Sequence, residues 1–95
     1  MIYTAQSYLN EAIIEEKRTK KDYHAKYAIF NDDGVDVNML IDGHHSLEAA
    51  KRDNVSPILE LTKNNFGKNY TLEQFVKSFN DLSNPVNIET GEELW

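Results

Sequence analysis

The sequence contains no cysteine, only two prolines and one tryptophan, and no long apolar run. Without cysteine the chain can form neither a disulfide framework nor a thiolate nucleophile, which suits a reducing compartment. No apolar stretch approaches the ~20 residues that a membrane-spanning helix needs. The first four residues lack the basic and apolar regions of a signal peptide. We therefore expect a cytoplasmic protein with no membrane association.

Positive charge is also scarce. Ten Lys and Arg stand against sixteen Asp and Glu, which gives a net charge of -6. Such an acidic balance opposes non-specific binding to DNA or to anionic membranes, although it leaves room for a local phosphate site. With 40% hydrophobic residues in 95, the chain is expected to form one domain over residues 1–95 with a modest core.

The first predicted element is a helix that Thr4 caps and that runs to about Lys20. Its apolar residues recur at helical spacing; they are Ala5, Tyr8, Leu9, Ala12 and Ile13. Basic residues gather at 17–21, where they complement the helix dipole. This cluster either holds a phosphate or is a solvated helix end, and the second interpretation is favoured.

A β-hairpin is expected next. Residues 26–30 form its first strand, the Asn-Asp-Asp-Gly segment at 31–34 forms a turn, and apolar and polar residues alternate over 35–42. A second helix follows, which buries Leu47 and Ala50 and ends near Asn54, a residue that tolerates the left-handed position. After Pro57, residues 58–62 are predicted to be a short edge strand.

The last third of the chain is predicted to contain a loop at 64–69 and one more helix. Thr71 and Gln74 have the spacing of a capping box, and Tyr70 with Phe75 fits a hydrophobic staple. The buried stripe of this helix comprises Leu72, Phe75, Val76 and Phe79. Residues 81–95 form either a small hairpin or an extended arm, with Trp95 as a packing anchor. The fold class is therefore α+β.

The candidate functional stretch is Asp42-Gly43-His44-His45-Ser46, where the second strand gives way to a helix. Backbone N–H groups and the positive end of the helix dipole converge at such a junction, and glycine lets a phosphate approach the backbone. The histidines can add donors. A purely structural interpretation, a tight turn with Asp42 as the helix cap, is equally compatible with these residues.

Other chemistries fit this stretch less well. Adjacent histidines diverge by about 100° on a helix, so they are poor joint ligands, and no metal site is predicted. Ser46 and the histidines are too close in sequence to face each other, and no glycine-flanked serine elbow is present, so no catalytic residue is assigned.

The motif resembles the ParB/sulfiredoxin-like superfamily. The resemblance is carried by Ile-Asp-Gly-His-His-Ser-Leu-Glu-Ala-Ala-Lys-Arg at 41–52, within a motif-bearing core of about 27–62. It implies a strand–turn–strand, helix and strand around a nucleotide cradle that Gly-x-x-Arg forms in the family. Family members bind CTP or ATP/ADP, commonly with Mg²⁺, and some transfer phosphate or hydrolyse the nucleotide; others are described as nucleases.

The chain departs from the family pattern at two points. Ser46 stands where the phosphate-gripping arginine is expected, and a hydroxyl cannot replace a bidentate guanidinium. The sulfiredoxin cysteine is missing, which excludes that reductase chemistry. Arg52 or Arg18 would have to reach in from elsewhere, and a carboxylate base would have to come from Glu48, Glu11 or Glu15. The helix-turn-helix of ParB does not fit after residue 62.

Three functions remain compatible with the sequence. The first is a ParB-like nucleotide- or phosphate-binding domain with weak hydrolysis or phosphotransfer, using Asp42, Gly43, His44, His45 and Ser46, with Glu48 and Arg52 as accessory residues. The second is a catalytically inactive acidic protein-binding module or inhibitor, which would suit a phage or mobile-element protein. A metal-dependent nuclease is the least favoured, because clustered carboxylates and a basic track are missing.

Overall fold

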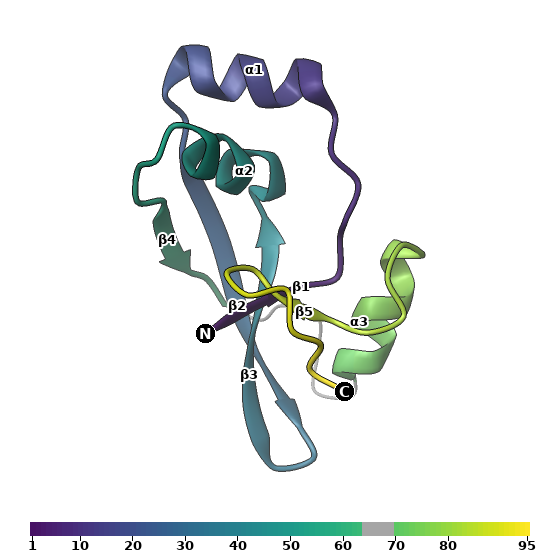
Figure 1. Cartoon of the computed structure of the whole chain (residues 1–95). Helices are drawn as coiled ribbons and strands as arrows, with labels where there is room; N and C mark the ends of the chain where they lie inside the picture. Colours follow the sequence, from purple (N-terminus) through teal and green to yellow (C-terminus); the bar gives the residue numbers. More distant parts are fainter. Residues whose placement is uncertain (64–69) are drawn as a thin grey trace.

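A computed structural model describes residues 1–63 and 70–95 of the chain, and it is an α+β fold of a five-stranded mixed sheet and three helices (Figure 1). The elements in chain order are β1 (Ile2–Thr4), α1 (Glu11–Lys20), β2 (His24–Asp32), β3 (Val35–Asp42), α2 (His44–Arg52), β4 (Ile58–Leu61), α3 (Leu72–Phe79) and β5 (Val86–Asn87). The predicted loop at 64–69 lies outside the described residues. None of the described helices is long and apolar enough to cross a membrane.

The predicted β-hairpin is confirmed as the centre of the sheet, whose strand order is β4-β2-β3-β1-β5. β2 and β3 pair antiparallel from Lys26–Asp42 to Asp32–Val35. Their turn holds Asp33 and Gly34 at φ of 54° and 87°. Two successive positive φ angles are the geometry of a type I′ turn, for which Asp-Gly is a preferred sequence.

The prediction for the first twenty residues is wrong in part. Residues 2–4 form β1, which pairs parallel with β3, and α1 begins only at Glu11 with Asn10 as its cap in place of Thr4. The predicted apolar stripe is not a helix face, because Tyr8 is 66% exposed and lies before the helix. Ile14 is the fully buried residue of α1, whereas Ile13 is 38% exposed.

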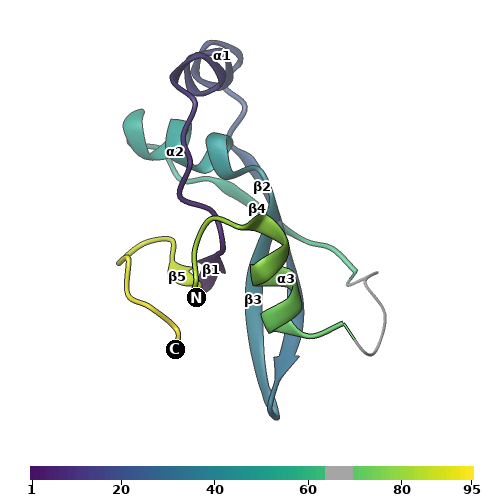
Figure 2. The ribbon, with the colours of Figure 1, turned by 90° about the vertical axis from the view of Figure 1, so that its right-hand side faces the viewer.

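The two faces of the sheet carry separate apolar clusters. Phe30 and Met39 pack with α3 on one face, where the rings of Phe30 and Phe75 stack with centroids 4.9 Å apart. Ala25 and Leu40 pack on the other face, together with Leu47 of α2. Figure 2 shows α3 alongside β3 and α2 near the upper end of β2. In the C-terminal segment, Ile88 packs on the α2 face, whereas Leu94 packs against the cluster on the α3 face.

The termini of the later helices follow the sequence prediction closely. The Thr71 hydroxyl accepts from the Gln74 N–H at 3.1 Å and the Gln74 side chain accepts from the Thr71 N–H at 2.9 Å, which confirms the capping box. Leu72, Phe75 and Val76 are buried as predicted. Asn54, just after α2, adopts the predicted left-handed conformation with φ 54°.

Of the two edge strands of the sheet, β4 follows from the sequence, whereas the sequence leaves the form of residues 81–95 open. β4 pairs parallel with β2 and is an edge strand, as Pro57 indicated. β5 pairs antiparallel with β1, and Val86 forms a bridge with Glu93, so the C-terminal segment turns back on itself as in the first of its two predicted forms. Trp95 is 46% exposed and donates from Nε1 to Asp32 at 3.1 Å.

Candidate functional site

Gly43 joins β3 to α2 and lies directly against the backbone of β2. A Cβ atom built on Gly43 would come within 2.6 Å of the Ala25 Cα and of the His24 carbonyl oxygen. Gly43 also has a φ of 94°, which side chains other than glycine rarely adopt. The close approach of two backbones thus requires glycine here, independently of any ligand.

The amino end of α2 has no side-chain cap. The Leu47 N–H donates to the Gly43 carbonyl at 2.9 Å, and no side chain caps the helix at Gly43. Asp42 is exposed at the end of β3, opposite Lys26, and does not serve as the cap that the structural interpretation expected. The N–H groups of the first turn therefore retain the capacity to bind an anion or water.

His45 points towards α1. Its Nε2 accepts from the Asn10 N–H at 3.1 Å, and the Asn10 side chain in turn accepts from the Ile13 N–H at 3.2 Å. Its ring lies edge-on to that of Tyr8, with centroids 6.5 Å apart. His45 therefore helps to fix the first turn of α1 and does not line the cavity described below.

His44 is the histidine that lines a cavity, and its Nε2 atom is buried without a hydrogen-bond partner among the described residues. Burial lowers the pKa of His44 below its ordinary value of 6.5, and the neighbouring His45 adds to this effect. Asp81, Glu48 and a hydrogen bond with the Tyr8 backbone oppose it. The Nε2 atom of His44 is thus buried, and it has no partner in good hydrogen-bond geometry among the described residues.

The side chain of Ser46 is not available to bind a ligand. It is 1% exposed and packs inward among the buried residues of α2, beside Ala49 and Ala50. The five motif residues are therefore adjacent in sequence but diverge in space. Asp42 faces solvent, Gly43 contacts β2, His45 faces α1, Ser46 faces the interior and His44 alone faces the cavity.

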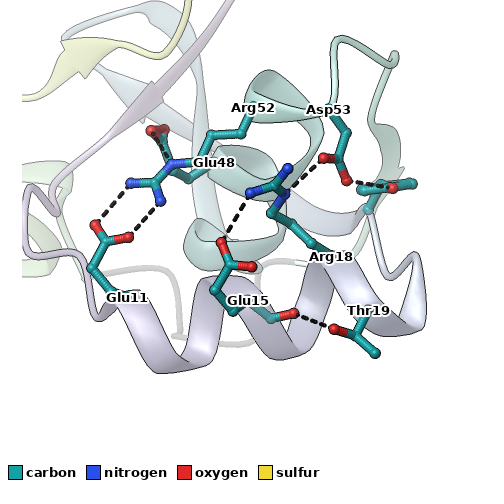
Figure 3. A network of polar contacts seen from close by, with 8 residues as sticks. Glu11, Glu15, Arg18, Thr19, Glu48, Arg52 and Asp53 are labelled. Carbon is teal, nitrogen blue, oxygen red and sulfur yellow. Dashed lines mark hydrogen bonds and ion pairs between the residues drawn. The ribbon is translucent and has the colours of Figure 1, made fainter.

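Arg52 and Arg18 are both held by carboxylates between α1 and α2 (Figure 3). Arg52 binds Glu11 through both terminal nitrogens, the Nη2–Oε1 distance being 2.9 Å, and its Nε lies 3.4 Å from Glu48. Arg18 donates from Nε to Asp53 at 2.7 Å and from Nη1 to Glu15 at 2.9 Å. Carboxylates therefore already engage both guanidinium groups, and neither is free to replace the missing motif arginine.

The basic cluster at 17–21 is largely paired as well. Lys17 lies 3.0 Å from Asp22 and Lys20 lies 2.8 Å from Glu16. The hydrogen bond from Lys17 lowers the pKa of Asp22. These pairs fit the favoured interpretation of a solvated helix end better than a phosphate site.

Asp53 is the centre of the contact between α1, α2 and the start of β2. It accepts from Arg18 and from the Tyr23 hydroxyl, both at 2.7 Å, and the two bonds lower its pKa. We expect Asp53→Asn to lower the melting temperature by a few degrees, because the variant retains one acceptor oxygen but loses the charge. Thermal unfolding followed by circular dichroism measures this.

The matched control for that experiment is Glu15→Gln, which removes only the exposed partner of Arg18. We expect it to change the melting temperature little. A high salt concentration should reduce the difference in melting temperature between the wild type and Asp53→Asn, because salt screens the exposed charges. An Asp53→Asn variant as stable as the wild type would contradict a clamping role for this carboxylate.

The cavity beside α2 has a volume of about 810 Å³, and its walls come from residues within 4–9, 44–51, 55–59 and 86–91. α2 contributes His44, Leu47, Glu48 and Lys51, which share one helix face by their spacing of three and four. The remaining wall mixes polar and apolar residues. Its apolar side chains are Leu9, Val55, Pro57, Leu59, Val86 and Ile88, and Glu89 adds a second carboxylate to that of Glu48. Of the predicted site residues, the cavity includes only His44 and Glu48.

Next to this cavity, Asp81 joins the segment after α3 to the segment before α1. Its carboxylate accepts from the Ser7 N–H at 2.6 Å, from the Ser7 hydroxyl at 2.7 Å and from the Tyr8 N–H at 3.1 Å. These bonds, led by the one from the Ser7 backbone, lower the pKa of Asp81. They hold the 4–9 wall in place, and Ser7 itself lines the cavity.

Sequence reasoning missed Leu47 and Lys51 as cavity residues, together with the wall at 86–91. The helical spacing from His44 indicates the α2 residues. Nothing local in the sequence links 86–91 to α2, because the two segments come together in the folded protein, where β5 pairs with β1 and Ile88 packs in the same cluster as Leu47.

No metal centre can be built from the part of the chain that the structure describes, since it contains no group of three or more His, Asp or Glu side chains close enough to share an ion. The nuclease alternative therefore finds no ligand set there.

Comparison with known proteins identifies no family for this chain. No protein-family model, curated protein or solved structure matches this chain. The resemblance to the ParB/sulfiredoxin-like superfamily therefore stays a prediction from the motif, and function must be argued from the geometry.

Proposed function

We propose that this protein binds a small phosphate-bearing ligand, such as a nucleotide, in the cavity beside α2. The observation that carries the proposal is the buried Nε2 atom of His44, which lacks a hydrogen-bond partner among the described residues. An unsatisfied buried polar atom costs about 1–3 kcal/mol. The atom is closed off from solvent, so the His44 ring would have to turn towards the cavity before a ribose hydroxyl or a base amino group could donate to it and remove that cost.

The form of the cavity supports a ligand with one anionic and one apolar part. His44 is the first residue of α2, so the cavity reaches the uncapped helix end, where backbone N–H groups favour a phosphate. Lys51 adds a positive charge on the same helix face. The apolar walls suit a nucleobase, and the volume of about 810 Å³ is within the range of small-molecule sites.

Binding is better supported than catalysis. Glu48 is the carboxylate that α2 contributes to the cavity, and it also accepts from Arg52. With Arg18 and Arg52 both paired with carboxylates, transferring or hydrolysing a phosphate would lack the charge stabilisation that such reactions require. Mg²⁺ would then accompany the nucleotide as a counter-ion, with CTP and ATP or ADP the candidates that the motif suggests.

A thermal-shift series tests the proposal. CTP, ATP, ADP and GTP, each with and without Mg²⁺, are added to the intact protein. At about ten times the dissociation constant a bound ligand should raise the melting temperature by about 5 °C or more. The absence of a shift with every nucleotide at millimolar concentration would overturn the proposal.

A catalytically inactive protein-binding module or inhibitor is the second candidate. The observation that favours it is that carboxylates bind both Arg18 and Arg52. Of the α2 residues that line the cavity, His44 and Lys51 are then the ones able to bind an anion. If no nucleotide binds, a pull-down from a lysate becomes the decisive measurement. Binding of a partner that is lost on changing acidic surface residues, but not His44, would support this function.

A further inference from the structure

The segment between β1 and α1, residues 5–10, forms one wall of the cavity, and we call it the strap. Figure 2 shows the strap running from β1 past α2 to α1. Its residues Gln6, Ser7 and Leu9 line the cavity. Since the strap belongs to neither a helix nor a strand, the bonds that reach it from other elements decide how firmly this wall is held.

The strap is held at two places by titratable side chains. Near its middle, Asp81 accepts from the N–H groups of Ser7 and Tyr8 at 2.6 and 3.1 Å. At its end, Nε2 of His45 accepts from the Asn10 N–H at 3.1 Å. A carboxylate and an imidazole thus hold backbone N–H groups that a helix or sheet would otherwise satisfy.

These bonds respond differently to a proton. A charged imidazole donates from both nitrogens, so protonated His45 cannot accept from the Asn10 N–H. His44 forms a hydrogen bond with the Tyr8 backbone that raises the pKa of His44, so this bond favours the protonated ring. The bonds from the strap lower the pKa of Asp81, which keeps its carboxylate an acceptor as the pH falls below neutral. Of these three contacts, a proton breaks the one to His45.

The groups around the two histidines keep α1 in place when that bond breaks. The titratable and charged groups near them are Tyr8 of the strap, Glu48 and Arg52 of α2, Glu11 of α1, and Asp81 after α3. Arg52 binds both Glu11 and Glu48, and its bond lowers the pKa of Glu11. This pairing therefore persists in mild acid, and the loosening is confined to the end of the strap.

We propose that protonation of His45 releases residues 8–10 of the strap and so opens one wall of the cavity in mild acid. The closed strap requires a neutral His45, so it is favoured at higher pH and lost as the pH falls. Histidines change charge between about pH 5 and 8. A consequence that rests on the proposed function is faster exchange of a bound nucleotide in acid, because Leu9 lies within the released residues and lines the cavity.

Hydrogen exchange of the Asn10 amide in the intact, ligand-free protein tests the release. The exchange rate is measured by NMR at about pH 7.5 and about pH 5, and each value is corrected for the intrinsic rate of the unfolded chain. We expect the protection of Asn10 to fall about tenfold or more, because each pH unit below the pKa favours the open form by up to tenfold. Amides in the middle of α1 and in the β2–β3 hairpin should keep theirs. Protection of Asn10 that does not fall relative to these amides overturns the proposal.

Two variants of His45 show whether this histidine is the group that responds. His45→Gln retains an acceptor of similar reach that takes up no proton in this range, so the Asn10 amide should be equally protected at both pH values. His45→Phe has no acceptor, and the same amide should be poorly protected at both. A His45→Gln protein that loses protection in acid as much as the wild type contradicts the assignment to His45.

A nucleotide measurement separates this inference from the proposed function. Hydrogen exchange needs no ligand, so it decides the release of the strap even if CTP, ATP, ADP and GTP all fail to bind. For the nucleotide with the largest thermal shift, the dissociation rate should rise between about pH 7.5 and about pH 5 in the wild type but not in His45→Gln. An equal rise in both proteins overturns the link between the strap and ligand exchange.

Discussion

Gly43→Ala is expected to destabilise the folded protein by about 3 kcal/mol or more. The new Cβ would lie 2.6 Å from the backbone of β2, at Ala25 and His24, and a central strand cannot move aside. The positive φ of 94° adds a further cost of about 1–2 kcal/mol for a residue with a side chain. Urea unfolding followed by far-ultraviolet circular dichroism measures the loss.

Gly91→Ala separates the two causes of this effect. Gly91 also has a positive φ, 76°, but a Cβ built there meets nothing within 4 Å. It should therefore lose only the conformational part, about 1–2 kcal/mol. If Gly43→Ala is no more harmful than Gly91→Ala, the close approach between Gly43 and β2 does not limit this position.

His44→Phe is expected to stabilise the ligand-free protein by about 1 kcal/mol while abolishing the thermal shift that a nucleotide causes. Phenylalanine keeps a ring at the cavity wall but removes the buried Nε2 atom, which has no partner among the described residues. A gain in stability together with a loss of binding is typical of a residue kept for its ligand and not for the fold. Melting curves with and without nucleotide measure both effects.

His45→Phe is the matched control for this variant. It removes the acceptor for the Asn10 N–H at the start of α1, so it should lower the melting temperature and retain the nucleotide shift. The two adjacent histidines should thus respond in opposite directions. Equal responses would contradict the assignment of one histidine to the cavity and the other to α1.

The pH dependence of His44→Phe follows from the same burial. Because burial lowers the pKa of His44 in the folded protein, the unfolded chain takes up a proton that the folded chain resists. The folded wild-type protein therefore keeps its full stability above the ordinary pKa of 6.5, and it loses stability as the pH falls below 6.5 through the lowered pKa of His44. The advantage of His44→Phe over the wild type should widen as the pH falls from about 7 to about 5.

The sequence predicts those parts of the fold that local chemistry determines. Asp33-Gly34 specifies its turn, Thr71 and Gln74 specify the start of α3, and Pro57 indicates an edge strand. The prediction for the first twenty residues is wrong because contacts with distant parts of the chain determine their structure. β1 is three residues long and is held by its pairing with β3 and β5, so its residues carry no periodicity that predicts a strand. The helical spacing from Ala5 to Ile13 misplaces the start of the helix.

The sequence predicts the strand–helix junction but not which of its residues line the cavity. The structure confirms the β3–α2 junction, yet a shift of one residue at the start of a helix decides which of His44 and His45 faces the cavity. Burial of Ser46 and the pairing of Arg52 with Glu11 are tertiary features, because α1 and α2 have to be packed together before either exists. Spacing along the sequence cannot supply that information.

The pairing of β5 with β1 has a consequence for protein synthesis. A growing chain can form the β2–β3 hairpin and α2 early, because their contacts are close in sequence. The wall at 86–91 and the Asp81 carboxylate that holds Ser7 are synthesised after the histidine motif. A nascent chain that already displays the whole motif therefore has only part of its cavity until residues 81–91 have been added and can fold.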